Sequence, residues 1–225
     1  MKLTTKMLAS GALALCALAA TAPASAQVQG RIATADVAGS ILGTTSFQNG
    51  YNQIVETYSA QIEQRQTKQQ QLTQLLQPFD TNGNGQLDEA ELPAVQNSPS
   101  FTQIQTLEQE VAGLTQQVQT ARIFVVEQIL VRYPEALGEV ATQQQVVMVL
   151  QPEVLQFAGQ GADISALISA SLNTKVPSVQ VVPPADYRPS REGAQILSDI
   201  QVMLVRVQQQ QAAQQQQATQ APAGR

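Results

Sequence analysis

Apolar residues recur at alternating steps of four and three along two long segments, the pattern of one helix face in a coiled coil. The segments cover 44–78 and 98–143 and are separated by a short stretch rich in Gly and Asn. The repeating positions are Phe47, Tyr51, Ile54, Tyr58, Ile62, Arg65, Gln69, Leu72 and Leu76, then Ile104, Leu107, Val111, Leu114, Val118, Ala121 and Val125. This arrangement predicts a long antiparallel coiled-coil hairpin with two arms.

Polar residues interrupt the repeating face in the middle of the first arm. Arg65 and Gln69 occupy positions in the seam, so we expect loose, bendable packing there. The preferred interpretation of this stretch is a solvated part of the arm. In the second arm, Ser98 is expected to cap the helix with Pro99 at its first position, and Pro134 to kink or restart it.

Shorter elements on either side of the arms predict a small body. Residues 31–37 have the composition of a strand, and Gly39 and Gly43 predict a flexible connection to the first arm. Within 145–173, two β-branched runs separated by a Gln-Pro turn predict a β-hairpin over 146–158 with a buried first strand, and Asp163 is expected to cap a helix. The predicted fold class is therefore α+β, mainly helical, with the coiled-coil hairpin projecting from a small β body.

The C-terminal part of the chain has a different composition. Residues 176–190 are rich in Pro and predict an extended linker, and 191–208 predict a helix with one apolar stripe. The Gln-rich tail, 209–225, is expected to be disordered. The C-terminal helix can dock on the body or bind a partner, and docking is the preferred interpretation.

Residues 1–26 have the pattern of a secretory signal peptide, which predicts a periplasmic protein. Lys2 and Lys6 precede an apolar run from Met7 to Ala20, and Ala24-Ser-Ala26 forms a cleavage site. The run is too short for a membrane anchor, and no later stretch is long enough, so no membrane span is expected. Cys16, the only cysteine, lacks the preceding small residue typical of a lipoprotein, and cleavage of the signal peptide removes it, so the mature chain is expected to contain no disulfide.

Composition narrows the classes of function. Two of the 12 basic residues lie in the predicted signal peptide, which leaves ten against 17 acidic residues and a net charge of −7. A nucleic-acid partner is therefore not expected. We also expect no enzyme activity, because the chain has no His, the mature chain no Cys, and neither a phosphate-binding loop nor a nucleophile motif occurs. Aromatic residues are only 4% of the chain, which favours elongated helices over one large core.

The stretch between the arms, 80–91, fills the twelve positions of an EF-hand calcium loop. The ligand positions 1, 3, 5, 7, 9 and 12 are held by Asp80, Asn82, Asn84, Gln86 through its backbone carbonyl, Asp88 and Glu91. Gly85 stands at position 6, where the chain must turn sharply. The competing interpretation is an Asn/Gly-rich turn with no metal.

The composition of this loop predicts a weak, structural Ca²⁺ site. Only three ligands are carboxylates and no second loop pairs with this one, so we expect a dissociation constant on the order of 10⁻⁴ to 10⁻³ M. Pro93 should interrupt the helix that leaves the loop, which argues against a calcium switch. Phe79 and Leu92 are expected to pack across the loop and hold the arms in register.

Three stretches carry a resemblance to a known family: Arg31-Ile-Ala-Thr-Ala-Asp-Val, the run from Val146 to Phe157, and Gly161-Ala-Asp-Ile-Ser-Ala-Leu-Ile-Ser-Ala-Ser-Leu-Asn173. With the predicted order of elements behind a signal peptide, the domain at 27–175 resembles the Skp/OmpH family of periplasmic chaperones. The resemblance implies a homotrimer whose strands close a β-barrel and whose helical hairpins surround a cavity. It also implies ATP-independent holding of unfolded outer-membrane proteins.

This chain departs from the family in three respects. It is acidic, it carries the calcium loop at the tip of the coiled coil, and it has the Pro-rich linker and C-terminal helix. An alternative function is therefore a calcium-binding structural or adaptor protein of the envelope that uses its coiled coil to bind a dedicated partner.

Overall fold

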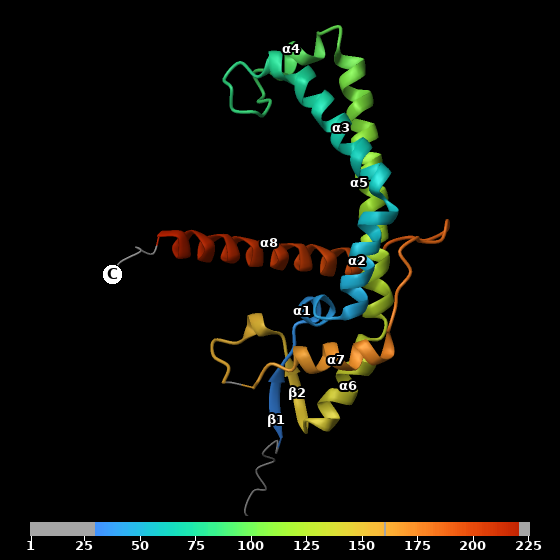
Figure 1. Ribbon diagram of the computed structural model, residues 1–225, viewed down its shortest axis with the longest axis vertical. Coiled ribbons are helices and arrows are strands. Elements are labelled where there is room, and N and C mark those ends of the chain that lie inside the picture. The colour runs from blue at the N-terminus through green and yellow to red at the C-terminus, as the bar shows by residue number, and fades with distance from the viewer. Residues whose placement is uncertain (1–29, 160, 221–225) are drawn as a thin grey trace, which may run out of the picture.

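The computed structural model describes residues 30–159 and 161–220, so the predicted signal peptide with Cys16 and the last five residues lie outside them. The chain is mainly helical α+β, as predicted, with a small sheet of two strands. A long helical arm rises from a small body that contains the sheet, and a C-terminal helix crosses the base of the arm (Figure 1). The elements are β1 Arg31–Thr34, α1 Val37–Leu42, α2 Thr45–Thr57, α3 Ser59–Leu76, α4 Leu92–Gln96, α5 Phe101–Leu130, α6 Tyr133–Gln143, β2 Val146–Leu150, α7 Ser165–Lys175 and α8 Arg191–Gln220, with short 3₁₀ helices at Gln77–Phe79 and Pro152–Val154.

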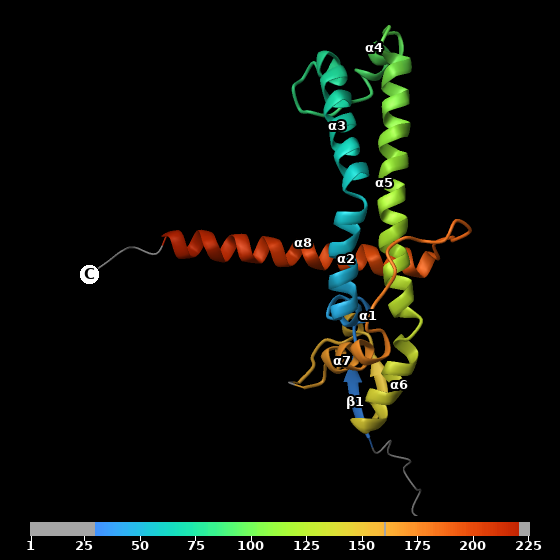
Figure 2. The ribbon, with the colours of Figure 1, turned by 45° about the vertical axis from the view of Figure 1, so that its right-hand side comes forward.

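The arm consists of α2 and α3 running outward and α5 running back, side by side in both views (Figures 1 and 2). A turn at Tyr58 separates α2 from α3, and α6 begins at Tyr133, next to Pro134, where a restart was predicted. Pro134 lacks a backbone N–H, so it is accommodated in the first turn of the new helix. Ser98 does not cap α5, which begins at Phe101; its hydroxyl donates instead to the Val95 carbonyl at the end of α4. The predicted cap is therefore wrong, because the nearby end of α4 uses the hydroxyl.

Two separate apolar clusters hold the arm together. At the outer end, Leu72, Val95, Ile104 and Leu107 are buried against one another, and this group is called the tip cluster below. At the base, Phe47, Ile54, Val118, Ala121 and Val125 belong to the core of the body. Arg65 and Gln69 are exposed between the two clusters, as the interrupted repeat predicted.

The sheet pairs β1 with β2 in parallel, and the predicted β-hairpin over 146–158 is wrong. Only its first half forms a strand, whereas Pro152 starts a 3₁₀ turn and Val154 and Phe157 are exposed. A parallel partner for β2 becomes available because the arm returns the chain to the body beside β1. The first strand is also less buried than predicted, since Val147 and Met148 are half-exposed.

The connection from β1 to the arm is a helix, α1, and the prediction of a flexible segment is wrong. Asp36 caps this helix, because its carboxylate accepts a hydrogen bond from the Ala38 N–H at 3.0 Å. Asp163 is not the cap residue of the later helix, α7, as predicted, because Ile164 holds that position; its carboxylate instead accepts from both the backbone N–H and the hydroxyl of Ser165, the first helical residue, at 2.8 and 2.6 Å. Asp163 also pairs with Thr34 as a parallel bridge, so this turn covers the end of β1.

The Pro-rich linker, 176–190, lies along α5 and is fixed there by two side chains. Gln128 exchanges hydrogen bonds with the backbone of Gln180 at 2.8 and 2.9 Å. Glu127 accepts one from the Tyr187 hydroxyl and one from the Ser190 N–H, both at 2.7 Å. Burial, followed by the bond to the Glu127 carboxylate and its charge, raises the pKa of Tyr187 well above its usual value. These bonds place Ser190 where α8 begins.

The C-terminal helix α8 is longer than the predicted 191–208 and includes most of the tail that was expected to be disordered. Gln and Ala are both favourable in helices, so a helix that has begun on the body can continue through them. Ile196, Leu197 and Ile200 are buried in the core, so the first half is docked as predicted. The second half extends away from the body, and its side chains from Val205 to Gln215 are exposed (Figure 1). No helix in the described part of the chain is long and apolar enough to cross a membrane.

Candidate metal loop

The twelve-residue loop at the outer end of the arm is closed by hydrogen bonds from its own side chains. Asp80 accepts from the backbone N–H groups of Asn84 and Gly85 at 3.1 and 2.7 Å. Asn82 accepts from the Asn84 N–H, and Asn84 from the Gln86 N–H, at 2.9 and 2.7 Å. The side chains at positions 1, 3 and 5 are thus each turned back toward the loop backbone.

The turn that the sequence placed at position 6 is present. Gly85 has a φ of 79° and Gly83 a φ of 70°, both in the left-handed region that glycine adopts readily. A side chain at Gly85 would meet no atom, so the backbone conformation, and not a lack of space, is the reason for glycine there.

Glu91 links the end of the loop to its beginning. Its Oε1 accepts hydrogen bonds from the backbone N–H and the hydroxyl of Thr81, both at 2.7 Å, although ten residues separate them. Only 5% of Glu91 is exposed. The Thr81 hydroxyl, together with the N–H groups of Asp88, Thr81 and Asn82, lowers the pKa of Glu91 against the opposing effect of burial. These hydrogen bonds therefore favour the ionised form of the carboxylate.

The six predicted ligands share one compact loop but are not gathered around one point. Asp88 accepts from the Asn82 side-chain amide at 3.0 Å and from the N–H of Ala90 at 2.9 Å. Within 30–159 and 161–220, no three acidic, His or Cys side chains lie close enough together to hold a metal. The donor set still suits calcium, since it consists of carboxylate, amide and carbonyl oxygens around a glycine turn. The residue types therefore suit Ca²⁺, while the carboxylates are bonded in this structure to N–H groups of the loop.

The loop is attached to the arm by part of the packing that the sequence predicted. Phe79 and Leu87 pack against the tip cluster, together with Leu75, Leu76 and Phe101. Leu92 does not take part as predicted, because it is 41% exposed and Val95 fills the buried position. The reason is the helix α4, which begins at Leu92 and places Val95 on its inner face. Pro93 lies in the first turn of this five-residue helix, which ends at Gln96.

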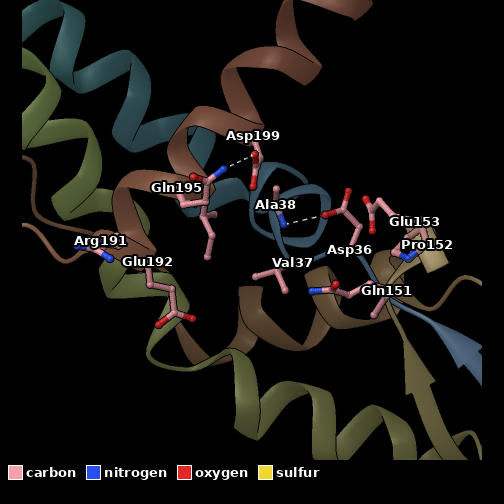
Figure 3. A pocket seen from close by; sticks show the side chains of 12 residues that line it. Asp36, Val37, Ala38, Gln151, Pro152, Glu153, Arg191, Glu192, Gln195 and Asp199 are labelled. Atoms are coloured by element: carbon pink, nitrogen blue, oxygen red, sulfur yellow. Dashed lines mark hydrogen bonds between the residues drawn. The ribbon is translucent and has the colours of Figure 1, made fainter.

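A second candidate site lies on the body, between α8 and the start of α1. This cavity of about 730 Å³ has Asp36, Glu153 and Asp199 at its rim, with Arg191 and Glu192 on the α8 side (Figure 3). Asp36 is engaged as the cap of α1, and Asp199 accepts a hydrogen bond from Gln195 at 3.0 Å. The sequence did not reveal this cavity, because its walls come from three segments far apart in the chain.

Comparisons of the chain with protein-family models, with curated proteins and with solved structures found no match.

Proposed function

We propose that this protein is an ATP-independent periplasmic holdase for unfolded outer-membrane proteins, acting as a homotrimer of the Skp/OmpH type. The observation that carries the proposal is an uncovered apolar surface on the sheet, at the opposite end of the molecule from the tip. The exposed residues of this surface, called the sheet surface below, are Ile32, Val147 and Met148 on the strands, and Val154 and Phe157 are exposed in the segment that follows β2. The signal-peptide pattern and the resemblance supply the compartment and the class of client.

The pleat of the sheet explains why this surface faces outward. Ala33 lies opposite Val149, and these two side chains pack on the core. Ile32 lies opposite Met148, and these residues directly precede Ala33 and Val149 on their strands. Because successive side chains alternate, this pair points to the other face. Ile32 is 53% and Met148 47% exposed. An apolar sheet face that is open to water marks an interaction surface, and further copies of the chain would cover it in the trimer.

The strand edges support the same proposal. On its outer side β1 is partly covered by the bridge to Asp163, whereas β2 has no other strand beside it in the described part of the chain. An uncovered edge offers backbone hydrogen-bonding groups to another chain, and closure of several copies into a barrel removes it. The run 154–158 has the composition of a strand and is exposed except for the half-buried Leu155, so it would then find its partner in a neighbouring copy.

In this trimer the three arms would enclose the client. Their exposed surfaces are rich in Gln and carry few apolar residues, which suits weak contacts repeated over a large area. Many weak contacts keep a client from aggregating without fixing its conformation.

Suppression of aggregation tests this function. An outer-membrane β-barrel protein unfolded in urea should scatter less light on dilution when about one trimer per client is present. Bovine serum albumin at the same mass concentration serves as the control. Undiminished scattering at a severalfold excess of trimer would contradict the holdase function.

The alternative is a calcium-binding envelope adaptor, and the projecting half of α8 favours it. Its exposed side chains, including Val205 and Val207, leave a helical surface that a dedicated partner could bind. This function is preferred if light scattering shows no holdase activity.

We also propose that calcium binds weakly at 80–91 and stiffens the tip of the arm. Ca²⁺ should raise the midpoint of thermal unfolding, with half-saturation at about 0.1–1 mM. Glu91→Gln should weaken this response at least tenfold, because it removes the only bidentate ligand, whereas Glu89→Gln, at a position without a ligand role, should respond like the wild type. Equal calcium responses of the Glu91 and Glu89 variants would rule out the site.

A further inference from the structure

A small cavity between the two sides of the arm has two arginines and no acidic residue among the residues that line it. It lies between α3 and α5 at the outer border of the body core and has a volume of about 80 Å³. Its lining residues are Ile62, Arg65, Thr115, Val118, Gln119 and Arg122. The volume exceeds the roughly 30 Å³ that one water molecule takes in the liquid, which leaves room for a small ion.

Arg122, one of the residues that line the cavity, also carries a buried hydrogen-bond donor without a partner among the described residues. Its Nε is buried without a hydrogen-bond partner in the described part of the chain. The guanidinium lies over the ring of Tyr51, 4.9 Å from the centroid, which stabilises the charge through the ring face. A cation–π contact gives the N–H group no acceptor, and a buried donor in a native protein normally binds a water or an ion.

Neither arginine at the cavity is neutralised. The ion pairs among residues 30–159 and 161–220 involve Lys68, Arg132 and Lys175, but not Arg65 or Arg122. This is notable in a chain whose net charge is −5, where carboxylates outnumber basic groups. Two guanidinium groups from opposite sides of the arm thus share one cavity without a counter-charge.

Gln119 adds a neutral donor from the same helix as Arg122. Its carbonyl oxygen accepts a hydrogen bond from the Gln201 side chain of α8 at 3.3 Å, which leaves its NH₂ group to donate. The Thr115 hydroxyl donates to the Val111 carbonyl at 2.7 Å and so is not a donor to the cavity. The donors available are therefore two guanidinium groups and one amide.

We infer that this cavity binds a small oxyanion, with phosphate as the representative ligand, between Arg65 of α3 and Arg122 of α5. Arginine suits this role, because its N–H groups match the spacing of the oxygens in phosphate and carboxylate. The bound anion joins the two sides of the arm where their apolar seam is interrupted. Gln119, which donates to the anion, is itself hydrogen-bonded to Gln201 of α8. This site is independent of the calcium loop and of the holdase function.

Thermal unfolding of the mature protein in inorganic phosphate tests the site. Chloride at equal ionic strength is the reference, and the variants are Arg65→Gln, Arg122→Gln and, as a matched control, Arg206→Gln on the exposed part of α8. The midpoint should rise saturably with phosphate in the wild type and the Arg206 variant. Half-saturation should need at least tenfold more phosphate in the other two, since each loses one charge-assisted contact.

A spectroscopic measurement keeps the test valid if Arg122→Gln fails to fold. In the wild type, the NMR signal of the Arg122 Nε–H should shift saturably with phosphate and remain still with chloride. Phosphate also stabilises proteins generally by exclusion from their surface, and this effect does not saturate. An equal, unsaturable rise in the midpoint of all four proteins, or an Arg122 signal that phosphate does not move, would overturn the inference.

Discussion

Met148→Glu is expected to leave the protein monomeric and without holdase activity, while its helical arm stays folded. Met148 lies opposite Ile32 on the outer face of the sheet and is 47% exposed, so the single chain tolerates a charge there. In the proposed trimer this face is covered, and an uncompensated buried carboxylate costs about 3–5 kcal/mol. Even the lower figure weakens association by more than about 100-fold. The molar mass in solution measures association, and light scattering with an unfolded client measures holdase activity. Circular dichroism measures whether the helical arm stays folded.

The matched control is Gln103→Glu, which adds the same charge on an exposed position of α5 near the tip. It should associate and suppress aggregation like the wild type. If the Met148 variant assembles as well as this control, the sheet surface is not the contact between copies.

Ile200→Ala is expected to lower the free energy of unfolding by about 2–5 kcal/mol, the usual cost of truncating a buried aliphatic side chain. Ile200 is 0% exposed in the docked half of α8, a helix that has no counterpart in the Skp/OmpH pattern. Urea denaturation followed by circular dichroism measures the change. A large loss would establish that this helix is a structural part of the body.

Val202→Ala on the same helix is the control, because Val202 is 47% exposed. Both changes replace a β-branched residue with Ala, so the gain in helix propensity is similar and the difference reports burial. The control should change stability by less than about 0.5 kcal/mol. Equal effects of the two substitutions would mean that α8 does not dock in solution.

The helical arm could be predicted because its determinants are local and periodic. The four-three spacing placed Phe47, Ile54 and Leu72 on one face of the first arm, and all three are buried. The same pattern located the polar interruption at Arg65 and Gln69. A helix face is written into consecutive residues, so it needs no knowledge of distant parts of the chain.

The sheet could not be predicted in the same way, because strand pairing is decided between distant segments. The run 146–150 forms a strand, but its partner is β1, more than a hundred residues away. The local pattern favoured the nearby run 154–158 instead, and Pro152 turns the chain away from it. The extent of α8 was missed for another reason: the Gln-rich composition resembles disorder, although Gln and Ala sustain a helix that is docked at its start.

The two candidate sites also differ in whether consecutive residues or distant segments form them. The loop at 80–91 is contiguous, so its residues and the turn at Gly85 could be assigned from spacing alone. The cavity between Arg65 and Arg122 joins α3 to α5, and the sequence indicated only that Arg65 interrupts a seam. The packing of Tyr51 beneath Arg122, which completes that site, depends on a third helix.

The molar mass of the mature protein in solution tests the central claim most directly, because the barrel and the enclosed cavity both require three copies. Sedimentation equilibrium over a range of micromolar concentrations should give three times the mass of one mature chain. The mass of a single chain throughout that range would contradict the proposed trimer and the holdase function built on it.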